Sequence, residues 1–242
     1  GNECTDPVCN AGVCETSNNT NACDGGAGTC DAGACVPNEA CEYTQDFEAL
    51  VQTDADALAN DGWVVGANVF APDGTTFLYD YFAFPAPNGG PAFSGIDVGQ
   101  GGPAQGAQQM VIYNDYNNAD HTNGTGNIIE ANVFQERPIV AADIGTTISF
   151  TFDAKAGNIE SPTTAEAFLK TLNPGDGFSE SAADRLDTTS LGATWGTTTL
   201  SIDILPGFEG HILQFGALSR AANETPSGNF YDNMSVCNAP TP

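Results

Sequence analysis

The cysteines constrain this chain more than any other feature of its sequence. Seven of the eight fall within the first 41 residues, and the eighth stands five residues before the last. Residues 1–40 are rich in Gly, Asn and Asp and contain almost no large apolar side chain, so they cannot bury a core of their own. We therefore predict a small arm held together by disulfides, and we expect all eight cysteines to be paired: Cys4, Cys9, Cys14, Cys23, Cys30, Cys35, Cys41 and Cys237.

The arm also contains an internal repeat. The run at residues 4–14 recurs at residues 23–35, and the last two cysteines of the first run are displaced by 21 positions in the second. Zinc is the competing use of closely spaced cysteines, but residues 1–40 contain no histidine and no Cys-x-x-Cys pair. The pattern favours two related units stapled by disulfides.

The pairing of the last cysteine is a hypothesis. If the six cysteines of residues 1–40 pair among themselves, Cys41 is left for Cys237. Such a bridge would join the residue before the first strand of the body to the residue after its last strand, and these two strands would then be neighbours. Many other pairings of eight cysteines are possible, and spacing alone does not choose between them.

The body, residues 41–242, is predicted to be one all-β domain. Apolar and polar side chains alternate with a period of two at residues 147–154 and again at 197–204, as in half-buried strands. Only residues 50–60 and 181–186 are predicted to be helical. Turn-rich stretches separate eight further expected strands, at residues 44–50, 63–70, 76–82, 108–113, 128–136, 164–172, 211–218 and 229–236. This pattern predicts a two-sheet antiparallel sandwich of jelly-roll type that follows the arm.

Three short motifs resemble those of a known family. The runs QDFE at 45–48, DGW at 61–63 and FYDNMSV at 230–236 are similar to the ends of carbohydrate-binding modules with the galactose-binding-like sandwich, and the likeness extends loosely over residues 41–237. In that family the first and last strands often hold a calcium ion with one carboxylate each. The resemblance thus implies a structural Ca²⁺ bound by Glu48 and Asp232. Calcium prefers six to eight oxygen ligands, and an ion that binds only the folded chain stabilises it.

The charge balance excludes some partners. The chain has 5 basic and 31 acidic residues, for a net charge of −26, which would repel nucleic acid and anionic lipid. The same acidity suits calcium, and it also keeps an exported protein soluble. Disulfides need an oxidising compartment, and the sequence shows neither an apolar signal segment nor a membrane span. We expect a secreted or surface-borne protein whose signal peptide has been removed.

Residues suited to catalysis are sparse. Neither of the two histidines, His121 and His211, stands in a nucleophile motif or beside a second metal-type ligand at usable spacing. The run from Glu130 to Glu136 invites comparison with a glycosidase strand, but Asn132 stands where that motif needs a carboxylate. The two glutamates are also six residues apart, about 20 Å along a strand, whereas a catalytic pair needs about 5 to 10 Å. We predict that the chain is not an enzyme.

A glycan-binding surface needs flat aromatic rings that stack on the sugar and amides that read its hydroxyl groups. Tyr113, Tyr116, Asn117 and Trp195 are the candidates. Core packing is the alternative for Trp195, and it is the expectation for Trp63. The Asn-rich loop around residue 117 is equally explained as a solvated turn.

Self-assembly is the remaining expectation. An arm that reaches onto the next copy makes a heterologous contact, which propagates as a filament if the rotation does not close. Residues 77–91 include several aromatic residues and no basic one, so they form either a partner-facing patch or a covered loop. We expect the repeating subunit of an extracellular filament or sheath, built from a carbohydrate-binding-like sandwich and joined to its own copies by the arm. The alternative is a calcium-stabilised carbohydrate-binding module or adhesin domain that acts as a monomer.

Overall fold

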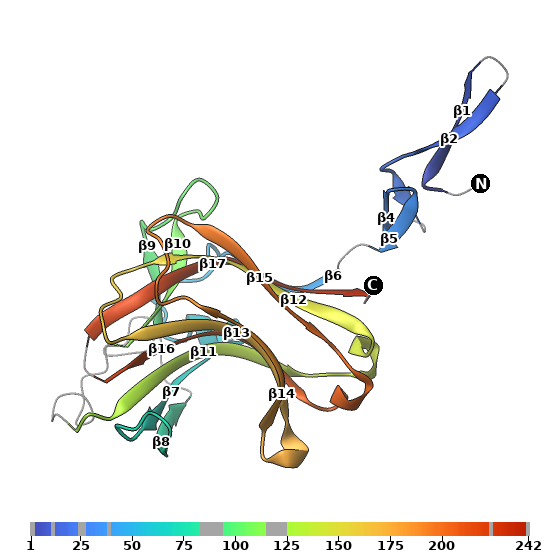
Figure 1. Ribbon diagram of the computed structural model, residues 1–242. Helices are drawn as coiled ribbons and strands as arrows, with labels where there is room; N and C mark the ends of the chain where they lie inside the picture. Colours follow the sequence, from blue (N-terminus) through green and yellow to red (C-terminus); the bar gives the residue numbers. More distant parts are fainter. Residues whose placement is uncertain are drawn as a thin grey trace.

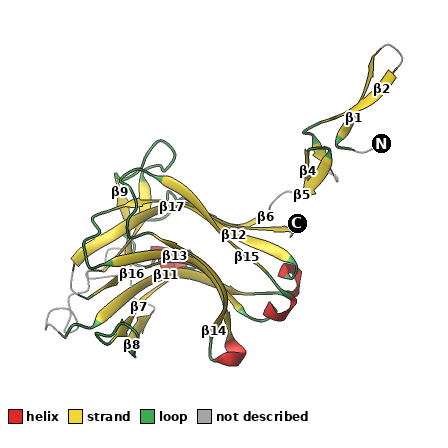
Figure 2. Ribbon diagram, viewed as in Figure 1, coloured by secondary structure: helices red, strands yellow, loops and turns green. Residues whose placement is uncertain are grey.

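Two antiparallel sheets of six strands each form the body of the protein (Figure 1). A computed structural model describes residues 3–10, 13–23, 28–37, 40–82, 94–114, 125–222 and 225–240 of the 242-residue chain. Two smaller sheets at the N-terminal end stand beside the sandwich, and strands dominate every part of the fold (Figure 2). The predicted class is confirmed: an all-β, two-sheet antiparallel sandwich with a small disulfide-rich arm.

The first sheet has the order β15-β12-β17-β10-β9, with β6 also paired to β17. The long strand β17 pairs with β10 along its first part and with β6 along its last part. The first and last strands of the body are therefore neighbours, and a disulfide joins Cys41 to Cys237 beside them, the pairing expected from the sequence. The strands are β6 (Ala40–Gln45), β9 (Ser94–Val98), β10 (Gln108–Asn114), β12 (Thr146–Ala156), β15 (Gly196–Asp203) and β17 (Thr225–Pro240).

The second sheet has the order β14-β13-β16-β11-β7-β8, so β14 and β8 form its edges. Figure 1 shows this sheet curving like an arch, with β8 at one end and the turn between β13 and β14 at the other. The strands are β7 (Val64–Phe70), β8 (Phe77–Phe82), β11 (Ile128–Pro138), β13 (Thr164–Asn173), β14 (Ser179–Asp187) and β16 (Ile212–Ala221). Short 3₁₀ turns follow three strands: η2 (Ala141–Asp143), η3 (Pro174–Asp176) and η4 (Pro206–Phe208).

Both helix predictions need correction. Residues 181–186 are not helical, because they lie in β14 and pair with β13. Ala182 and Leu186 alternate with exposed neighbours and pack against the core, so tertiary pairing overrides the helical propensity of this run. Of residues 50–60, only α1 (Ala57–Asn60) is helical. Strand β9 was not predicted at all.

The core fills the space between the two sheets. Phe150 of β12 packs across the core against Phe215 of β16 at a ring-centroid distance of 5.3 Å. Its neighbour Phe152 lies 5.0 Å from Phe150 and 6.0 Å from Tyr231 of the adjacent strand β17. All four rings are at most 4% exposed. Their burial follows from the period of two, which sends alternate side chains of each strand to the same face.

A hydrogen-bond network closes the core beside α1. One carboxylate oxygen of Asp61 accepts from the Tyr43 hydroxyl and the Gln45 amide, both at 2.7 Å, and from the Trp63 indole at 3.1 Å. Trp63 is 2% exposed, in agreement with its predicted place in the core. Burial, and then the neighbouring Asp61, raise the pKa of Tyr43 far above its usual value. The network ties β6 to the start of β7.

The arm consists of two small antiparallel sheets. The first is the hairpin of β1 (Thr5–Asn10) and β2 (Val13–Asn18), and the second contains β3 (Ala22–Cys23), β4 (Gly28–Asp31) and β5 (Ala34–Pro37). The internal repeat is visible in the register, because residues 9 and 14 face each other in one hairpin as residues 30 and 35 do in the other. The division into an arm of residues 1–40 and a sandwich of residues 41–242 stays a prediction.

Sulfur atoms form the core of the arm. Disulfides join Cys4 to Cys30 and Cys23 to Cys35. Because these two bridges pack together, the sulfurs of Cys4, Cys23 and Cys35 lie within 4.8 Å of one another, and all three are already bonded in disulfides. Cys4, Cys23 and Cys30 are at most 2% exposed.

Candidate functional site

The arched second sheet carries a cleft of about 1070 Å³ on the face that points away from the core. We call it the concave cleft. Its walls come from five of the six strands of the sheet and from the turn before β14. The lining residues are Asn68, Phe77, Asp80, Phe82, Glu130, Asn132, Phe134, Glu136, Lys170, Leu172, Gly177, Phe178 and Gln214.

Strand β11 forms the floor of the concave cleft. Its even-numbered residues from Glu130 to Glu136 line the cleft, whereas the odd-numbered Ile129, Ala131 and Val133 are fully buried in the core. This division follows from the alternation of side chains along a strand. The run does not fit a glycosidase motif, because Asn132 stands where that motif needs a carboxylate. The sequence signal for a ligand-binding face is the alternation of polar and aromatic residues with apolar ones along this strand.

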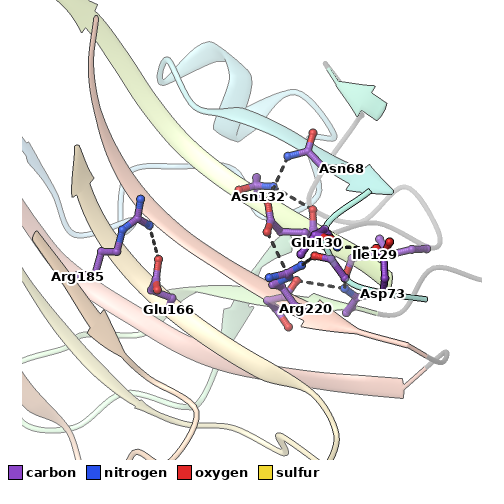
Figure 3. Close-up of polar contacts among 12 residues, drawn as sticks. Asn68, Asp73, Ile129, Glu130, Asn132, Glu166, Arg185 and Arg220 are labelled. Carbon is purple, nitrogen blue, oxygen red and sulfur yellow. Dashed lines mark hydrogen bonds and ion pairs between the residues drawn. The ribbon is translucent and has the colours of Figure 1, made fainter. Parts of the chain in front are cut away.

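Glu130 organises the centre of the floor. Its Oε1 accepts from the side-chain amides of Asn68, at 3.1 Å, and Asn132, at 3.2 Å, and its Oε2 lies 3.3 Å from Nε of Arg220 (Figure 3). Three adjacent strands, β7, β11 and β16, thus converge on one carboxylate. The amide oxygens of Asn68 and Asn132 have no hydrogen-bond donor among the described residues, so they can accept from a ligand.

The other polar groups of the cleft come from β8, β11, β13 and β16. The Gln214 amide donates to Glu136 at 2.6 Å. Lys170 lies over the ring of Phe168, with its ammonium 4.4 Å from the centroid. Burial, and then repulsion by Arg185, lower the pKa of Lys170. β11 pairs with β16 without a register shift, so the two glutamates of the floor stay about 20 Å apart along the strand and cannot act as a glycosidase pair.

Aromatic rings stand at both ends of the concave cleft. Phe178 follows Gly177, and both adopt left-handed backbone conformations, with φ of 61° and 60°. A phenylalanine rarely takes this conformation, and such strain persists where the surrounding structure imposes it. The Phe178 side chain is nevertheless 61% exposed. At the other end Phe82 is 40% exposed, and its ring meets that of Phe134 at a centroid distance of 6.2 Å.

The predicted glycan residues do not line the concave cleft. Tyr113 lies on β10, and Trp195 immediately precedes β15, so both belong to the first sheet. Tyr116 and Asn117 lie outside the described residues. The structure therefore brings none of the described candidates to the cleft.

The two predicted calcium ligands have different surroundings. Asp232 is fully buried, and its Oδ2 has no hydrogen-bond partner in the described structure. Burial, with help from the carboxylates of Asp153 and Asp46, raises the pKa of Asp232 to about 7. By contrast, one oxygen of Glu48 already accepts from the backbone N–H groups of residues 107 and 108, both at 2.7 Å. An orphaned buried carboxylate oxygen fits a cation, so Asp232 suits the predicted ion, whereas Glu48 clamps a loop.

Comparison with known proteins places the fold. No protein-family model matches the chain, and no curated protein matches it in sequence. Among solved structures, it is similar to a Stig cyclase from Fischerella sp. TAU, with a TM-score of 0.50 and 16% identity over 85% of this chain and 100% of that one. It is also similar to the xylan-binding CBM22-1 domain of Paenibacillus barcinonensis Xyn10C, with a TM-score of 0.43 and 10% identity over 84% and 97% of the two chains.

A family 16 carbohydrate-binding module is similar over a shorter span, with a TM-score of 0.40 and 10% identity over 62% of this chain and 88% of that one. These values describe a loose likeness of fold, and the resemblance predicted from the sequence is confirmed at that level. The prediction that the chain is not an enzyme is wrong, because a Stig cyclase, which is an enzyme, is among the solved structures with a similar fold.

Two observations bear on location. The disulfides are compatible with an extracellular protein, because such bonds persist in oxidising compartments. Among the described residues, no helix is long and apolar enough to cross a membrane.

Proposed function

We propose that this chain is an exported protein that binds a neutral polysaccharide in the concave cleft. The observation that carries the proposal is the combination of exposed phenylalanine rings at both ends of the cleft with side-chain amides between them. Rings of this kind stack on the apolar faces of sugar units, and amides hydrogen-bond to hydroxyl groups. Phe178 gives the strongest support for a binding site. Its ring is exposed and does not pack in the core, although its backbone adopts a strained positive φ.

The shape of the cleft favours a chain over a single sugar. The cleft extends from β8 to β13, which are four strand spacings apart in the second sheet, and continues to Phe178. At about 4.8 Å per spacing, the strands alone span about 19 Å. A stretch of several sugar units fits this length.

The charge of the cleft selects the class of polysaccharide. Asp80, Glu130 and Glu136 line it, against one lining cation, Lys170. Arg220 offsets the charge of Glu130 from beside the cleft. Polysaccharides that carry carboxylates or sulfates would meet repulsion from the remaining acids and from the net charge of −26. Neutral glycans meet none.

The test is retention of the full chain on insoluble cellulose, xylan, mannan and chitin, followed by titration with soluble fragments of whichever is bound. Replacing one stacking ring costs about 0.5 to 1.5 kcal/mol, so Phe178→Ala is expected to weaken binding about 2- to 13-fold. Leu205→Ala is the matched control, since Leu205 is 55% exposed and does not line the cleft. Equal affinity of Phe178→Ala and the unchanged chain, or no retention on any polymer, would contradict the proposal.

Self-assembly into a surface filament or sheath is a second proposed function. The edge strand β8 supports it, because Phe77, Leu78 and Tyr79 are 52%, 44% and 39% exposed there. Exposed apolar residues on an edge strand favour pairing with another chain. The arm would then reach the neighbouring copy. Negative-stain electron microscopy of the full chain tests this: ordered fibres are expected, and dispersed single particles would contradict it.

Calcium is proposed as a structural ion at Asp232, with Asp46 as the nearby carboxylate from the end of the first strand. Bound there, the ion would neutralise buried negative charge and join the first strand of the body to the last. The orphaned Oδ2 of Asp232 supports this assignment. One oxygen of Glu48 holds the loop at residues 107 and 108, and its role as a second calcium ligand stays a prediction.

A further inference from the structure

The first sheet carries a second hollow, on the face opposite the concave cleft. Its volume is about 510 Å³, and we call it the β10 hollow, lined by Asp97, Gln100, Val111, Tyr113, Asn158 and Phe230. Tyr113 and Val111 alternate along β10 with Met110 and Ile112, which are buried in the core. The lining side chains of β10 therefore point to the outer surface of the sandwich.

Glycines allow the two aromatic rings to lie in the floor of the hollow. Gly228 pairs with Tyr113 across the strands, and a Cβ added at residue 228 would stand 2.8 Å from the Tyr113 Cβ. A Cβ added at Gly157 would stand 3.1 Å from the Phe230 ring. The atoms nearest to these added Cβ atoms are backbone oxygens, that of Ile112 for residue 228 and that of Gly228 for residue 157, so close backbone packing requires both glycines, and their missing side chains leave the two rings uncovered.

Hydrogen-bonding groups surround the rings and are held in place. The Gln100 N–H donates to Gln109 at 3.2 Å, and its carbonyl accepts from Lys155 at 2.6 Å and from the Trp195 indole at 3.1 Å. Its side-chain Nε2 has no acceptor among the described residues. Oδ2 of Asp97 likewise has no partner in the described structure, because only Oδ1 is used, by the N–H of residue 98. A fixed donor and a fixed acceptor thus border the same aromatic floor.

Lys155 contacts both Trp195 and Phe230, and of these two rings only Phe230 lines the hollow. Its ammonium lies 5.2 Å from the Trp195 ring centroid and 5.4 Å from that of Phe230, which are cation–π distances. Trp195 is therefore a supporting residue that fixes Lys155 and Gln100. Tyr113, in contrast, is one of the residues that line the hollow.

We infer that the β10 hollow is a second saccharide site, which takes one neutral sugar unit by stacking on Tyr113 and hydrogen bonding to Asp97 and Gln100. Because the hollow and the concave cleft lie on opposite outer faces, one short stretch of sugar chain cannot fill both at once. The protein would join two glycan chains, which raises retention on a polymer through a second attachment. The bridging part rests on the proposed function, whereas binding in the hollow is independent of it.

The experiment titrates the full chain with the methyl glycosides of glucose, xylose, mannose and N-acetylglucosamine, using saturation-transfer NMR. At least one glycoside is expected to bind. Tyr113→Ala and Asp97→Ala should each weaken that binding about tenfold, and Phe178→Ala and Leu205→Ala should leave it unchanged. Asp97→Ala tests the same site independently, in case Tyr113→Ala fails to fold. Binding of no glycoside, or equal binding by Asp97→Ala and the unchanged chain, overturns the inference.

A bridging assay separates the two sites. Mixed with the soluble polysaccharide that the cleft binds, the unchanged chain should produce turbidity, and Tyr113→Ala should bind without producing it. If Phe178→Ala binds polysaccharide normally while Tyr113→Ala loses the glycoside, the proposed function fails and the hollow stands. Turbidity that is equal for Tyr113→Ala and the unchanged chain overturns the bridging.

Discussion

Removal of the Cys41–Cys237 disulfide is expected to cost the sandwich a large share of its stability. The bridge closes a loop of 196 residues. In the chain-entropy model, a loop of this length contributes about 5 kcal/mol to the free energy of unfolding by restricting the unfolded chain. Domains are stable by only about 5 to 15 kcal/mol in total. The double substitution Cys41→Ala/Cys237→Ala should therefore leave the protein marginally stable, although β6 still pairs with β17.

Urea unfolding followed by tryptophan fluorescence measures the loss, because Trp63 and Trp195 both lie in the sandwich. With a slope of about 2.5 kcal/mol per molar urea, the midpoint should fall by about 2 M. Cys23→Ala/Cys35→Ala is the matched control, since it opens a loop of 12 residues within the arm and should leave this transition unchanged. A fall of less than about 0.4 M in the first variant, or an equal fall in the control, would refute the reasoning.

Three further predictions follow from single residues. Calcium at millimolar concentration should raise the melting temperature, and Asp232→Asn should abolish the rise; an equal rise in both proteins would remove Asp232 from the site. Asp61→Ala should destabilise the fold by about 2 to 4 kcal/mol, because the half-buried donors of Tyr43 and Gln45 lose their acceptor; an unchanged urea midpoint would contradict this. Burial raises the pKa of Tyr231 to about 12, so the folded state keeps a proton that the unfolded state releases above pH 10. Stability should therefore fall as pH rises from 10 to 12, and Tyr231→Phe should lessen the slope.

Much of the fold was predictable because its strands bury one face. The alternation at residues 147–154 predicts β12, and the cysteine layout predicts that β6 and β17 are neighbours. The helix predicted at residues 181–186 failed because local helical propensity does not determine the structure of the edge strand β14. Its pairing with β13 decides the structure instead.

The site was less predictable, because residues far apart in sequence build it. Asn68 and Arg220 reach Glu130 from 62 residues before it and 90 residues after it, through strand pairing that no local motif reveals. The alternation from Glu130 to Glu136 is the local sequence signal for the floor of the cleft, and it was compared only with a catalytic motif. Tyr113 and Trp195 were predicted to bind a glycan, but the structure places them at the first sheet, away from the concave cleft.

The central claim is that the concave cleft binds a neutral polysaccharide. The most direct test is to titrate the uniformly ¹⁵N-labelled chain with hexasaccharides of xylan, cellulose, mannan and chitin and to follow the NMR signals of its side-chain amides. The account predicts that at least one hexasaccharide shifts the amide signals of Asn68, Asn132 and Gln214, which lie between the phenylalanine rings of the concave cleft. Shifts confined to amides outside the cleft, or no shift with any hexasaccharide, would contradict it.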